Sequence, residues 1–390
     1  MWHNESRLFY PSVLAAEQCS SERTAIYKQR LVKSDDILCD LTGGLGVDLY
    51  FFSQKVRHVI YVEKENEYCD AVQYNMNILG ASNVCVVNSD AIELVISNDS
   101  SISEANVFYI DPARRGISNK RMFAINDCEP DITKIWNLLP GRREENKEIL
   151  SSIAEVEIQP ELRMPVKIIV KLSPMLDLNH VLSQLPGIDE VHVLSVKNEC
   201  KELLIVASNA DCSDSGLLKH KASFSQKNEA EIICVNYTTA GAEQSFRFKL
   251  SEEHSAPISF VEKTGKNLYE PNTSILKAGA YKSVALRFEI GKLNVNSHLY
   301  SSDNLISSFP GRIFEIMEVI PFNNRTSKTL AAIIPQANIT VRNFPLSVEE
   351  LRKRLRICDG GEIFLFATTL QHNKKVLIKC CKVCSVTDVG

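Results

Sequence analysis

Long hydrophobic runs are missing from this 390-residue sequence. No apolar stretch reaches the roughly 18 residues that a membrane-spanning helix needs, and the first residues lack the basic-then-apolar pattern of a secretory signal. An excess of positive charge is also lacking, because 44 Lys and Arg face 48 Asp and Glu. That balance argues against a generally basic nucleic-acid binder. We expect a cytoplasmic protein that involves no membrane.

Clustered cysteines are scarce, although the chain has 12 cysteines. Several, such as Cys85 and Cys234, lie inside apolar runs that are predicted strands. Scattered cysteines are typical of a reducing compartment, where the thiol packs as a small hydrophobe. The one close pair, Cys381 and Cys384, has no second Cys or His pair nearby. Because a structural zinc site needs about four ligands, we expect no metal.

Apolar runs that alternate with helical segments predict a parallel sheet after a mostly helical lead segment, 1–36. Within the lead segment, Ser20–Arg23 offers caps for a helix over Thr24–Val32. A second helix is predicted over Glu65–Leu79. The predicted strands are Ile37–Leu41, His58–Val62, Val84–Val87, Val107–Ile110 and Lys167–Leu172.

Two more strand candidates, Glu190–Val196 and Leu203–Ala207, lie too close together for a crossover helix. They predict an antiparallel hairpin around Asn198–Lys201. A sheet of seven strands that ends in this way is typical of class I methyltransferases and not of nicotinamide-binding Rossmann sheets. The predicted fold class is therefore α/β, a Rossmann-like class I methyltransferase sheet followed by smaller α+β C-terminal domains.

The second half of the chain has a different pattern of predicted strands and helices. Ala230–Tyr237 and Ser245–Leu250 are predicted strands, and Ser274–Phe288 is a predicted helix. Val348–Leu355 is another predicted helix, with Ser347 and Glu350 in the positions of a capping box.

A glycine turn follows the first predicted strand, in the string Asp40-Leu-Thr-Gly-Gly-Leu-Gly-Val-Asp48. Glycines there let a tight turn pass close to a bound nucleotide. A dinucleotide site would have a small third residue at position 49, where this chain has Leu49. An acid at the strand end suits a cofactor with a positively charged amino-acid moiety better than a pyrophosphate. The candidate cofactor-binding residues of the turn are Asp40, Thr42, Gly43, Gly44 and Gly46.

An acid also ends the second predicted strand, and another follows the third. Glu63 could accept both ribose hydroxyls of an adenosine group, and Asp90, followed by Ala91, is placed to meet the adenine edge. The alternatives are a solvated strand-end acid for Glu63 and an ordinary loop acid for Asp90.

The fourth predicted strand ends in Asp111-Pro-Ala-Arg-Arg-Gly116, and the fifth in Lys171-Leu-Ser-Pro174. The carboxyl ends of parallel strands form the crevice where ligands bind, so a substrate should meet a methyl donor here. The arginines could hold phosphate or pair with acids on the next helix, and a simple turn would also explain the Ser-Pro pair. Asp111, Pro112, Arg114 and Ser173 are candidate catalytic residues, Asp111 could also contact the cofactor, and Arg115 and Lys171 are candidate substrate ligands.

Positive charge gathers at the C-terminus. Residues 311–390 contain 12 Lys or Arg against 7 Asp or Glu. This asymmetry suits a segment that meets phosphate, although an ordinary solvated surface fits equally well. The candidate ligands for such a phosphate are Arg342, Arg352, Lys353, Arg354 and Arg356.

With these residues in view, nearly the whole chain resembles the bacterial class I methyltransferases that carry a C-terminal THUMP-like domain. The resemblance rests on these strings: Glu17–Glu22 with Thr24-Ala25 and Tyr27-Lys28, the glycine turn, Asp111–Arg115, Lys197–Glu202, Glu270–Ser274, Lys277–Gly279 and Asn338–Pro345.

That resemblance implies S-adenosyl-L-methionine as cofactor and tRNA or rRNA as substrate, because THUMP domains deliver RNA to a catalytic domain. It also implies a small ferredoxin-like region before the THUMP-like one. Gln18, Ser21 and Thr24 could close over the methionine end of the cofactor. The expected domains are a helical lead at 1–36, the methyltransferase domain at 37–210, a β-rich connection at 211–270, the ferredoxin-like region at 271–316 and the THUMP-like domain at 317–390.

The string at Asp111 also looks like the Asp-Pro-Pro-Arg of RNA 5-methyluridine methyltransferases. Those enzymes use a Cys after the fifth strand, where this chain has Ser173-Pro174. The string equally departs from the Asp-Pro-Pro-Tyr of amino-group methyltransferases, so the target atom stays open. The alternatives to an RNA methyltransferase are a methyltransferase of proteins or small molecules, and a non-catalytic RNA-binding module. An NAD-dependent oxidoreductase is a more distant one.

Overall fold

The computed structural model of this chain describes residues 2–97, 99–114, 125, 128–137, 166–208 and 229–383. The chain divides into two compact units, the first of residues 1–192 and 201–230, the second of residues 193–200 and 231–390. The first unit contains the predicted parallel sheet, and the second contains the remaining β-rich part of the chain.

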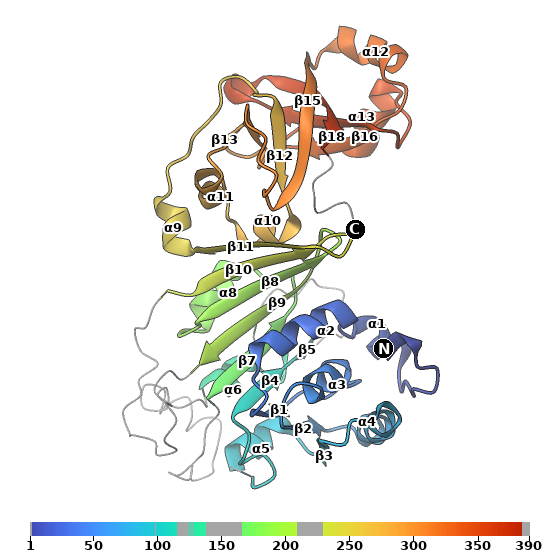
Figure 1. The fold of residues 1–390 in the computed structure, drawn as a ribbon, viewed down its shortest axis with the longest axis vertical. Coiled ribbons are helices and arrows are strands. Elements are labelled where there is room, and N and C mark those ends of the chain that lie inside the picture. The colour runs from blue at the N-terminus through green and yellow to red at the C-terminus, as the bar shows by residue number, and fades with distance from the viewer. Residues whose placement is uncertain are drawn as a thin grey trace. The chain divides into compact units, whose positions relative to one another are not determined.

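Five strands of the first unit pair in parallel, in the order β7-β4-β1-β2-β3 (Figure 1). They are β1 (Ile37–Asp40), β2 (His58–Glu63), β3 (Val84–Asn88), β4 (Val107–Ile110) and β7 (Lys167–Leu172). Their side chains are mostly buried except in β3, which lies at the end of this order, as expected of apolar strands that are covered on both faces. All five predicted strands are confirmed to within one residue at each end.

The predicted hairpin is also confirmed. It consists of β8 (Glu190–Val196) and β9 (Glu199–Ser208), and β9 runs antiparallel to β7. In strand order β9 lies between β7 and β8, as in class I methyltransferases. The predicted turn at Asn198–Lys201 is wrong, because the turn is the pair Lys197–Asn198, with φ of 53° and 61°. Positive φ at both central residues is typical of a two-residue type I′ turn.

Short helices make up most of the lead segment, as predicted. The predicted helix over Thr24–Val32 starts earlier, at Glu22, because the Ser21 side chain caps α2 by accepting from Thr24 N. It ends at Lys28, where a 3₁₀ turn follows. The helices among the described residues of the first unit are η1 (Trp2–Asn4), α1 (Val13–Gln18), α2 (Glu22–Lys28), η2 (Gln29–Leu31), α3 (Val47–Ser53), α4 (Asn66–Leu79), α5 (Ala91–Ser97), α6 (Ile132–Asn137) and α8 (Leu178–Gln184).

The second unit begins with the hairpin of β10 (Glu231–Tyr237) and β11 (Glu243–Lys249), followed by α9 (Leu250–Ser255). A seven-stranded sheet follows in the order β13-β14-β12-β15-β18-β17-β16. Its neighbouring strands pair antiparallel, except for the parallel pair β16–β17. Its strands are β12 (Asn267–Pro271), β13 (Gly291–Lys292), β14 (Tyr300–Ser302), β15 (Gly311–Pro321), β16 (Asn338–Arg342), β17 (Ile363–Thr369) and β18 (Lys375–Lys382).

The prediction of one helix over Ser274–Phe288 is wrong, because two helices replace it. They are α10 (Thr273–Ala278) and α11 (Lys282–Arg287). Gly279 ends α10 with φ of 77°, a left-handed conformation that glycine adopts without strain. The helix α13 (Val348–Leu355) and its Ser347–Glu350 capping box are confirmed. Together with α12 (Asn324–Ile333), α13 packs into an aliphatic core beside the sheet.

No helix in the described part of the chain has the length and apolar character needed to cross a membrane. Every cysteine in that part is a free thiol. The described residues also contain no group of three or more His, Cys, Asp or Glu side chains arranged to hold a metal ion.

Candidate active site

The glycine turn lies where β1 ends, between Asp40 and α3. An added Cβ at Gly43 would come within 2.8 Å of Val62 O, so this glycine lets the turn press against the end of β2. Gly44 differs, because an added Cβ there would meet only Thr42 O, at 3.9 Å. The turn is therefore packed on the side of Gly43 and open on the side of Gly44, which makes it a surface on which a ligand could rest.

Glu63, at the end of β2, holds this turn in place. One of its oxygens accepts from Gly44 N at 3.0 Å and the other from Glu65 N at 3.0 Å. The Tyr61 hydroxyl donates to Gly44 O at 2.6 Å. Gly46, with φ of 77°, begins α3. Because a carboxylate oxygen has two acceptor positions, Glu63 can accept ribose hydroxyls in addition to these backbone bonds.

Asp90 has a structural task in the loop before α5. Its Oδ1 accepts from Ile92 N at 2.8 Å and Glu93 N at 3.2 Å, which caps the first turn of the helix. Ala91 is buried at the start of that helix. A contact of Asp90 or Ala91 with adenine stays a prediction.

Thr42 links the ends of β1 and β4. Its amide and its hydroxyl both donate to Asp40 Oδ1, at 3.1 and 3.2 Å, and the hydroxyl oxygen accepts from Asp111 N at 2.7 Å. Asp40 is buried, and burial raises its pKa to about 8, with the carboxylates of Asp48 and Asp111 adding to the rise. At neutral pH Asp40 therefore holds a proton that a cationic ligand would help to displace.

Asp111 and Lys171 form an ion pair across the ends of β4 and β7. Lys171 Nζ donates to Asp111 Oδ2 at 2.6 Å, and the Asp111 side chain is 39% exposed. Burial alone would lower the pKa of Lys171, but the carboxylates of Asp111, Asp48 and Glu202 raise it above its usual value. Lys171 thus stays charged and cannot act as a proton acceptor near neutral pH.

The structure describes only part of the other candidate residues that follow β4 and β7. Pro112 follows Asp111, and the Ser173 hydroxyl oxygen accepts from Met175 N at 3.2 Å, within the turn after β7. Arg114 belongs to the short strand β5 (Ala113–Arg114), which pairs with β6 (Cys128–Glu129), and its side chain lies outside the described residues, as does all of Arg115.

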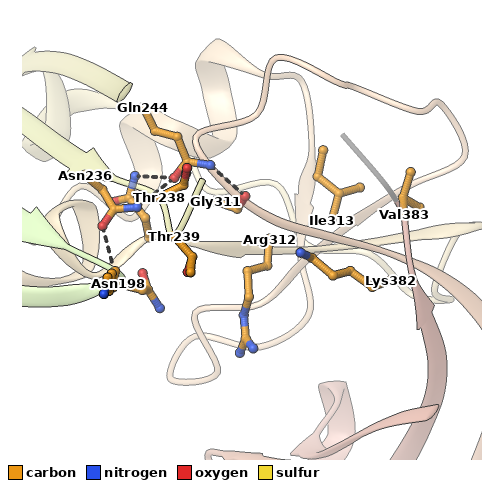
Figure 2. A pocket seen from close by; sticks show the side chains of 12 residues that line it. Asn198, Asn236, Thr238, Thr239, Gln244, Gly311, Arg312, Ile313, Lys382 and Val383 are labelled. Carbon is orange, nitrogen blue, oxygen red and sulfur yellow. Dashed lines mark hydrogen bonds between the residues drawn. The ribbon is translucent and has the colours of Figure 1, made fainter. Parts of the chain in front are cut away.

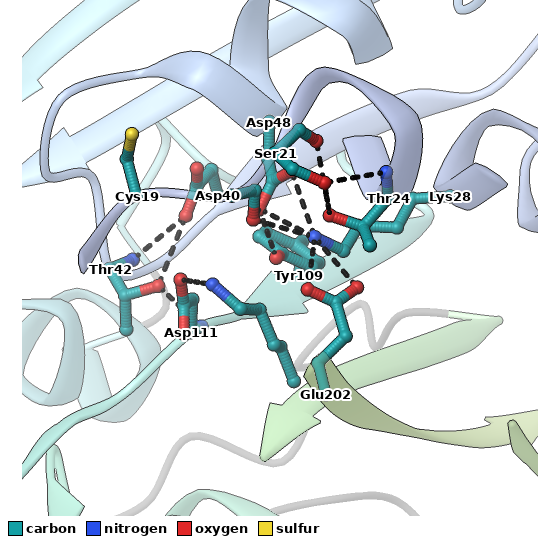
Figure 3. A network of polar contacts seen from close by, with 12 residues as sticks. Cys19, Ser21, Thr24, Lys28, Asp40, Thr42, Asp48, Tyr109, Asp111 and Glu202 are labelled. Carbon is teal, nitrogen blue, oxygen red and sulfur yellow. Dashed lines mark hydrogen bonds and ion pairs between the residues drawn. The ribbon is translucent and has the colours of Figure 1, made fainter. Parts of the chain in front are cut away.

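A buried ion cluster that the sequence analysis did not predict lies beside Asp40, Thr42 and Asp111 (Figure 3). Lys28 Nζ donates to Asp48 Oδ1 and Oδ2, each at 2.9 Å, and to Ser20 Oγ at 2.8 Å. It also lies 3.1 Å from Glu202 Oε1. The Tyr109 hydroxyl donates to Asp48 Oδ2 at 2.6 Å. The Lys28 side chain is 0% exposed, so this ammonium depends entirely on protein partners.

The two carboxyl groups of the cluster titrate differently. Burial alone would raise the pKa of Asp48, yet the ammonium groups of Lys28 and Lys171, with the Tyr109 hydroxyl, hold it below its usual value. Burial raises the pKa of Glu202 despite the same two ammonium groups. Asp48 is therefore the fixed negative charge of the cluster, and Glu202 is the group that gains a proton more easily.

Weak signals for this cluster exist in the sequence. Asp48 is in the glycine-turn string, and Lys28 and Glu202 are in two strings that carry the family resemblance. Through Lys28, the lead segment thus contacts Asp48 and Glu202. Ser21 and Thr24 hydrogen-bond to each other at 3.2 Å in the first turn of α2. The Gln18 side chain lies outside the described residues, and closure of these residues over a cofactor stays a prediction.

In the second unit, the predicted RNA ligand Arg342 is tied to an acid. Its Nε and Nη2 donate to Glu270 Oε1 at 3.1 and 2.9 Å, and Arg312 donates to the other carboxylate oxygen. Glu270 is buried, while both guanidinium groups are partly exposed. Because one carboxylate holds two arginines, this triad keeps an excess positive charge.

The remaining predicted RNA ligands lie on or just after α13. Arg352 pairs with Asp359 at 2.6 Å, and Arg354 donates to Asn324 Oδ1 at 2.9 Å. Three of the five candidates are exposed: Lys353, Arg354 and Arg356.

Comparison with protein families gives two matches in the second unit. Residues 268–310 match a ferredoxin-like domain, and residues 311–382 match a family described as THUMP domain-like. No curated protein matches the chain.

Among solved structures, the chain is similar to a proposed methyltransferase from Porphyromonas gingivalis W83. The two share 36% identity with a TM-score of 0.79, over 98% of this chain and 86% of that one. An rRNA methylase from Streptococcus thermophilus is 11% identical over 49% of this chain and 97% of that one, with a TM-score of 0.30. A precorrin-8w decarboxylase from Methanobacterium thermoautotrophicum is 13% identical over 49% and 91%, also with a TM-score of 0.30.

We predict that Lys28→Met destabilises the protein by about 3 to 5 kcal/mol, because Asp48 and Glu202 are then buried without the ammonium group that pairs with both. Urea unfolding followed by circular dichroism measures the loss. Lys33→Met, at an exposed lysine in the same segment, is the matched control. Adding Asp48→Asn and Glu202→Gln to Lys28→Met should restore part of the stability. A Lys28→Met loss as small as that of the control would contradict the prediction.

We predict that Asp40→Asn removes a pH dependence of stability. The unfolded chain releases the Asp40 proton near the usual pKa of 3.8, whereas the folded chain keeps it until about pH 8. The free energy of unfolding therefore falls as pH rises between these values, by at most about 1.4 kcal/mol per pH unit. The stability advantage of Asp40→Asn over the parent should grow from pH 5 to pH 8 in urea unfolding. A constant difference would show that Asp40 titrates normally.

Proposed function

This chain belongs to the family of class I methyltransferases that carry a C-terminal THUMP-like domain, and on that premise we propose that it transfers a methyl group from S-adenosylmethionine to RNA. The observation that carries the proposal is the glycine turn, open at Gly44 and flanked by Asp40 and Glu63, in a sheet of methyltransferase strand order. These residues lie at the carboxyl ends of β1 and β2, where ligands of such sheets bind.

The residues of the turn fit this cofactor. A side chain at Gly44 would project into open space, which is the space that a nucleoside needs. Glu63 has acceptor positions for two ribose hydroxyls, and Asp40 can balance the positive charge of the methionine end. When bound, S-adenosylmethionine supplies a methyl group on a positively charged sulfur. Asp40, Thr42, Gly43, Gly44, Gly46 and Glu63 are the residues that we propose hold it, with Asp90 and Ala91 toward the adenine.

Asp111 is the residue that we propose meets the methyl acceptor. Its side chain is partly exposed, and Lys171 holds one of its oxygens. Because Lys171 stays charged, Asp111 is the group of the pair that can accept a hydrogen bond or a proton from the acceptor. Pro112 stiffens the backbone after Asp111, and Ser173 shapes the next turn. We propose that these residues align the methyl acceptor with the cofactor, because methyl transfer requires the acceptor atom, the methyl group and the sulfur to lie in line.

The RNA part of the proposal rests on the second unit. Its THUMP domain-like region carries exposed basic residues on and just after α13, and basic side chains neutralise phosphate. Arg342 and Arg352, which are paired with acids, would instead orient neighbouring groups. We propose that Lys353, Arg354 and Arg356 contact the RNA backbone.

We predict that the purified protein transfers label from methyl-labelled S-adenosylmethionine to total RNA from cells that lack its gene. Digestion of the labelled RNA and mass mapping then identify the nucleotide. Label in protein or in small molecules, with none in RNA, would favour a different acceptor. Cofactor binding without transfer to any RNA would instead indicate a binding module that retains the fold.

We predict that Asp40→Ala and Glu63→Ala each abolish binding of S-adenosylmethionine, because each removes a carboxylate from one end of the cofactor. Isothermal calorimetry of the full chain measures the affinity. Glu67→Ala, at an exposed acid in the first turn of α4, is the control that should bind normally. Near-parental affinity of both test variants, or a preference of the parent for a dinucleotide, would refute this cofactor site.

A further inference from the structure

A polar cavity of ≈ 130 Å³ lies within the second unit, and none of its lining residues belongs to the candidate active site (Figure 2). It is formed by the β8–β9 turn, the β10–β11 hairpin, the start of α10 and parts of β15 and β18. We call it the amide cavity, and the residues that define it here are Lys197, Asn198, Asn236, Gln244, Arg312 and Lys382. Its volume is well below the about 300 to 1,000 Å³ of pockets for whole small-molecule ligands, so a small group suits it better.

Side-chain amides make one wall of the cavity, and hydrogen bonds fix them. Asn236 Nδ2 donates to Gln244 Oε1 at 3.1 Å, and Gln244 Nε2 donates to Gly311 O at 3.1 Å. Asn198 N donates to Asn236 Oδ1 at 3.0 Å, and Asn198 Oδ1 accepts from Thr273 N at 2.9 Å. Figure 2 shows Asn198, Asn236 and Gln244 together on one side of the cavity. The wall is therefore preorganised, with its polar atoms ordered before any ligand arrives.

The charge of the cavity is positive. Lys197, Arg312 and Lys382 line it, and none of the described residues that line it is Asp or Glu. In Figure 2 the Lys382 side chain extends toward Arg312. Arg312 forms an ion pair with the Glu270 carboxylate, and Arg342 pairs with the same carboxylate. The single negative charge of Glu270 is thus already matched by Arg342, so Arg312 still contributes positive charge to the cavity.

We propose that the amide cavity binds a phosphate group of the RNA backbone. Ammonium and guanidinium groups beside ordered amides are the donors that phosphate oxygens prefer, and their bonds to phosphate are charge-assisted. The cavity has room for such a group but not for a whole nucleoside. This inference rests on the proposed function and adds to it a second RNA contact, distinct from the basic residues on α13.

The test uses the full chain with Lys197→Gln and Lys382→Gln combined. Both lysines are exposed, so the fold should tolerate the change, and equal thermal unfolding and equal cofactor affinity verify this. The control combines Lys263→Gln with Lys374→Gln, which removes two exposed lysines of the same unit outside the cavity. The probe is fluorescently labelled bulk tRNA, titrated at several salt concentrations.

We expect the cavity variant to bind this RNA on the order of tenfold more weakly near physiological salt. The slope of log affinity against log salt should also become shallower by about 1, because the variant no longer neutralises one phosphate. If the cavity variant keeps the parental affinity and slope while the parent binds and methylates RNA, this inference is overturned and the proposed function stands. If the parent itself neither binds nor methylates RNA, both fail. A loss equal to that of the control would likewise refute a specific contact.

Discussion

The burial of the Lys28 ammonium between two carboxyl groups is the interaction on which the candidate active site depends. A fully buried cation is costly unless it is paired and hydrogen-bonded, and Lys28 obtains its partners from α3 and β9. These ion pairs connect α2, α3 and β9, three segments that are far apart in the chain. Because Asp48 lies in the first helical turn after the glycine bend, the same contact also fixes the start of α3 behind the proposed cofactor surface.

The charges around Lys28 do not cancel. Two ammonium groups, those of Lys28 and Lys171, face the carboxyl groups of Asp48, Asp111 and Glu202, while Asp40 keeps its proton near neutral pH. When Glu202 is ionised, one negative charge is in excess. Burial raises the pKa of Glu202, and repulsion from the Asp48 carboxylate adds to the rise. A cationic ligand would relieve this repulsion and help to ionise Asp40. The electrostatics of the crevice thus favour a positively charged cofactor, in agreement with the proposed methyl donor.

The parallel strands and the glycine turn could be predicted because they depend on local pattern, with apolar runs for β4 and β7 and glycines where φ is positive. The hairpin turn was harder to place, since Lys197 takes a positive φ for which lysine has no preference, and only Asn198 signals it. The split between α10 and α11 depends on Gly279, which the alanine pattern around it obscured. The Lys28–Glu202 contact spans 174 residues, and no local pattern encodes it. The same holds for Arg342, whose acid partner lies 72 residues away.

The short segment Lys197–Glu202 contributes residues both to the amide cavity and to the buried ion cluster around Lys28. Lys197 and Asn198 form the tight turn that borders the amide cavity, and Glu202, only five residues after Lys197, accepts the buried ammonium of Lys28. Lys197 lies in the turn before β9 and Glu202 lies within β9, so the two side chains meet different surroundings. A substitution at Glu202 should therefore disturb the buried cluster, whereas one at Lys197 should change only the surface charge. This difference is the physical reason to expect cofactor binding and RNA binding to be separable by mutation within a single hairpin.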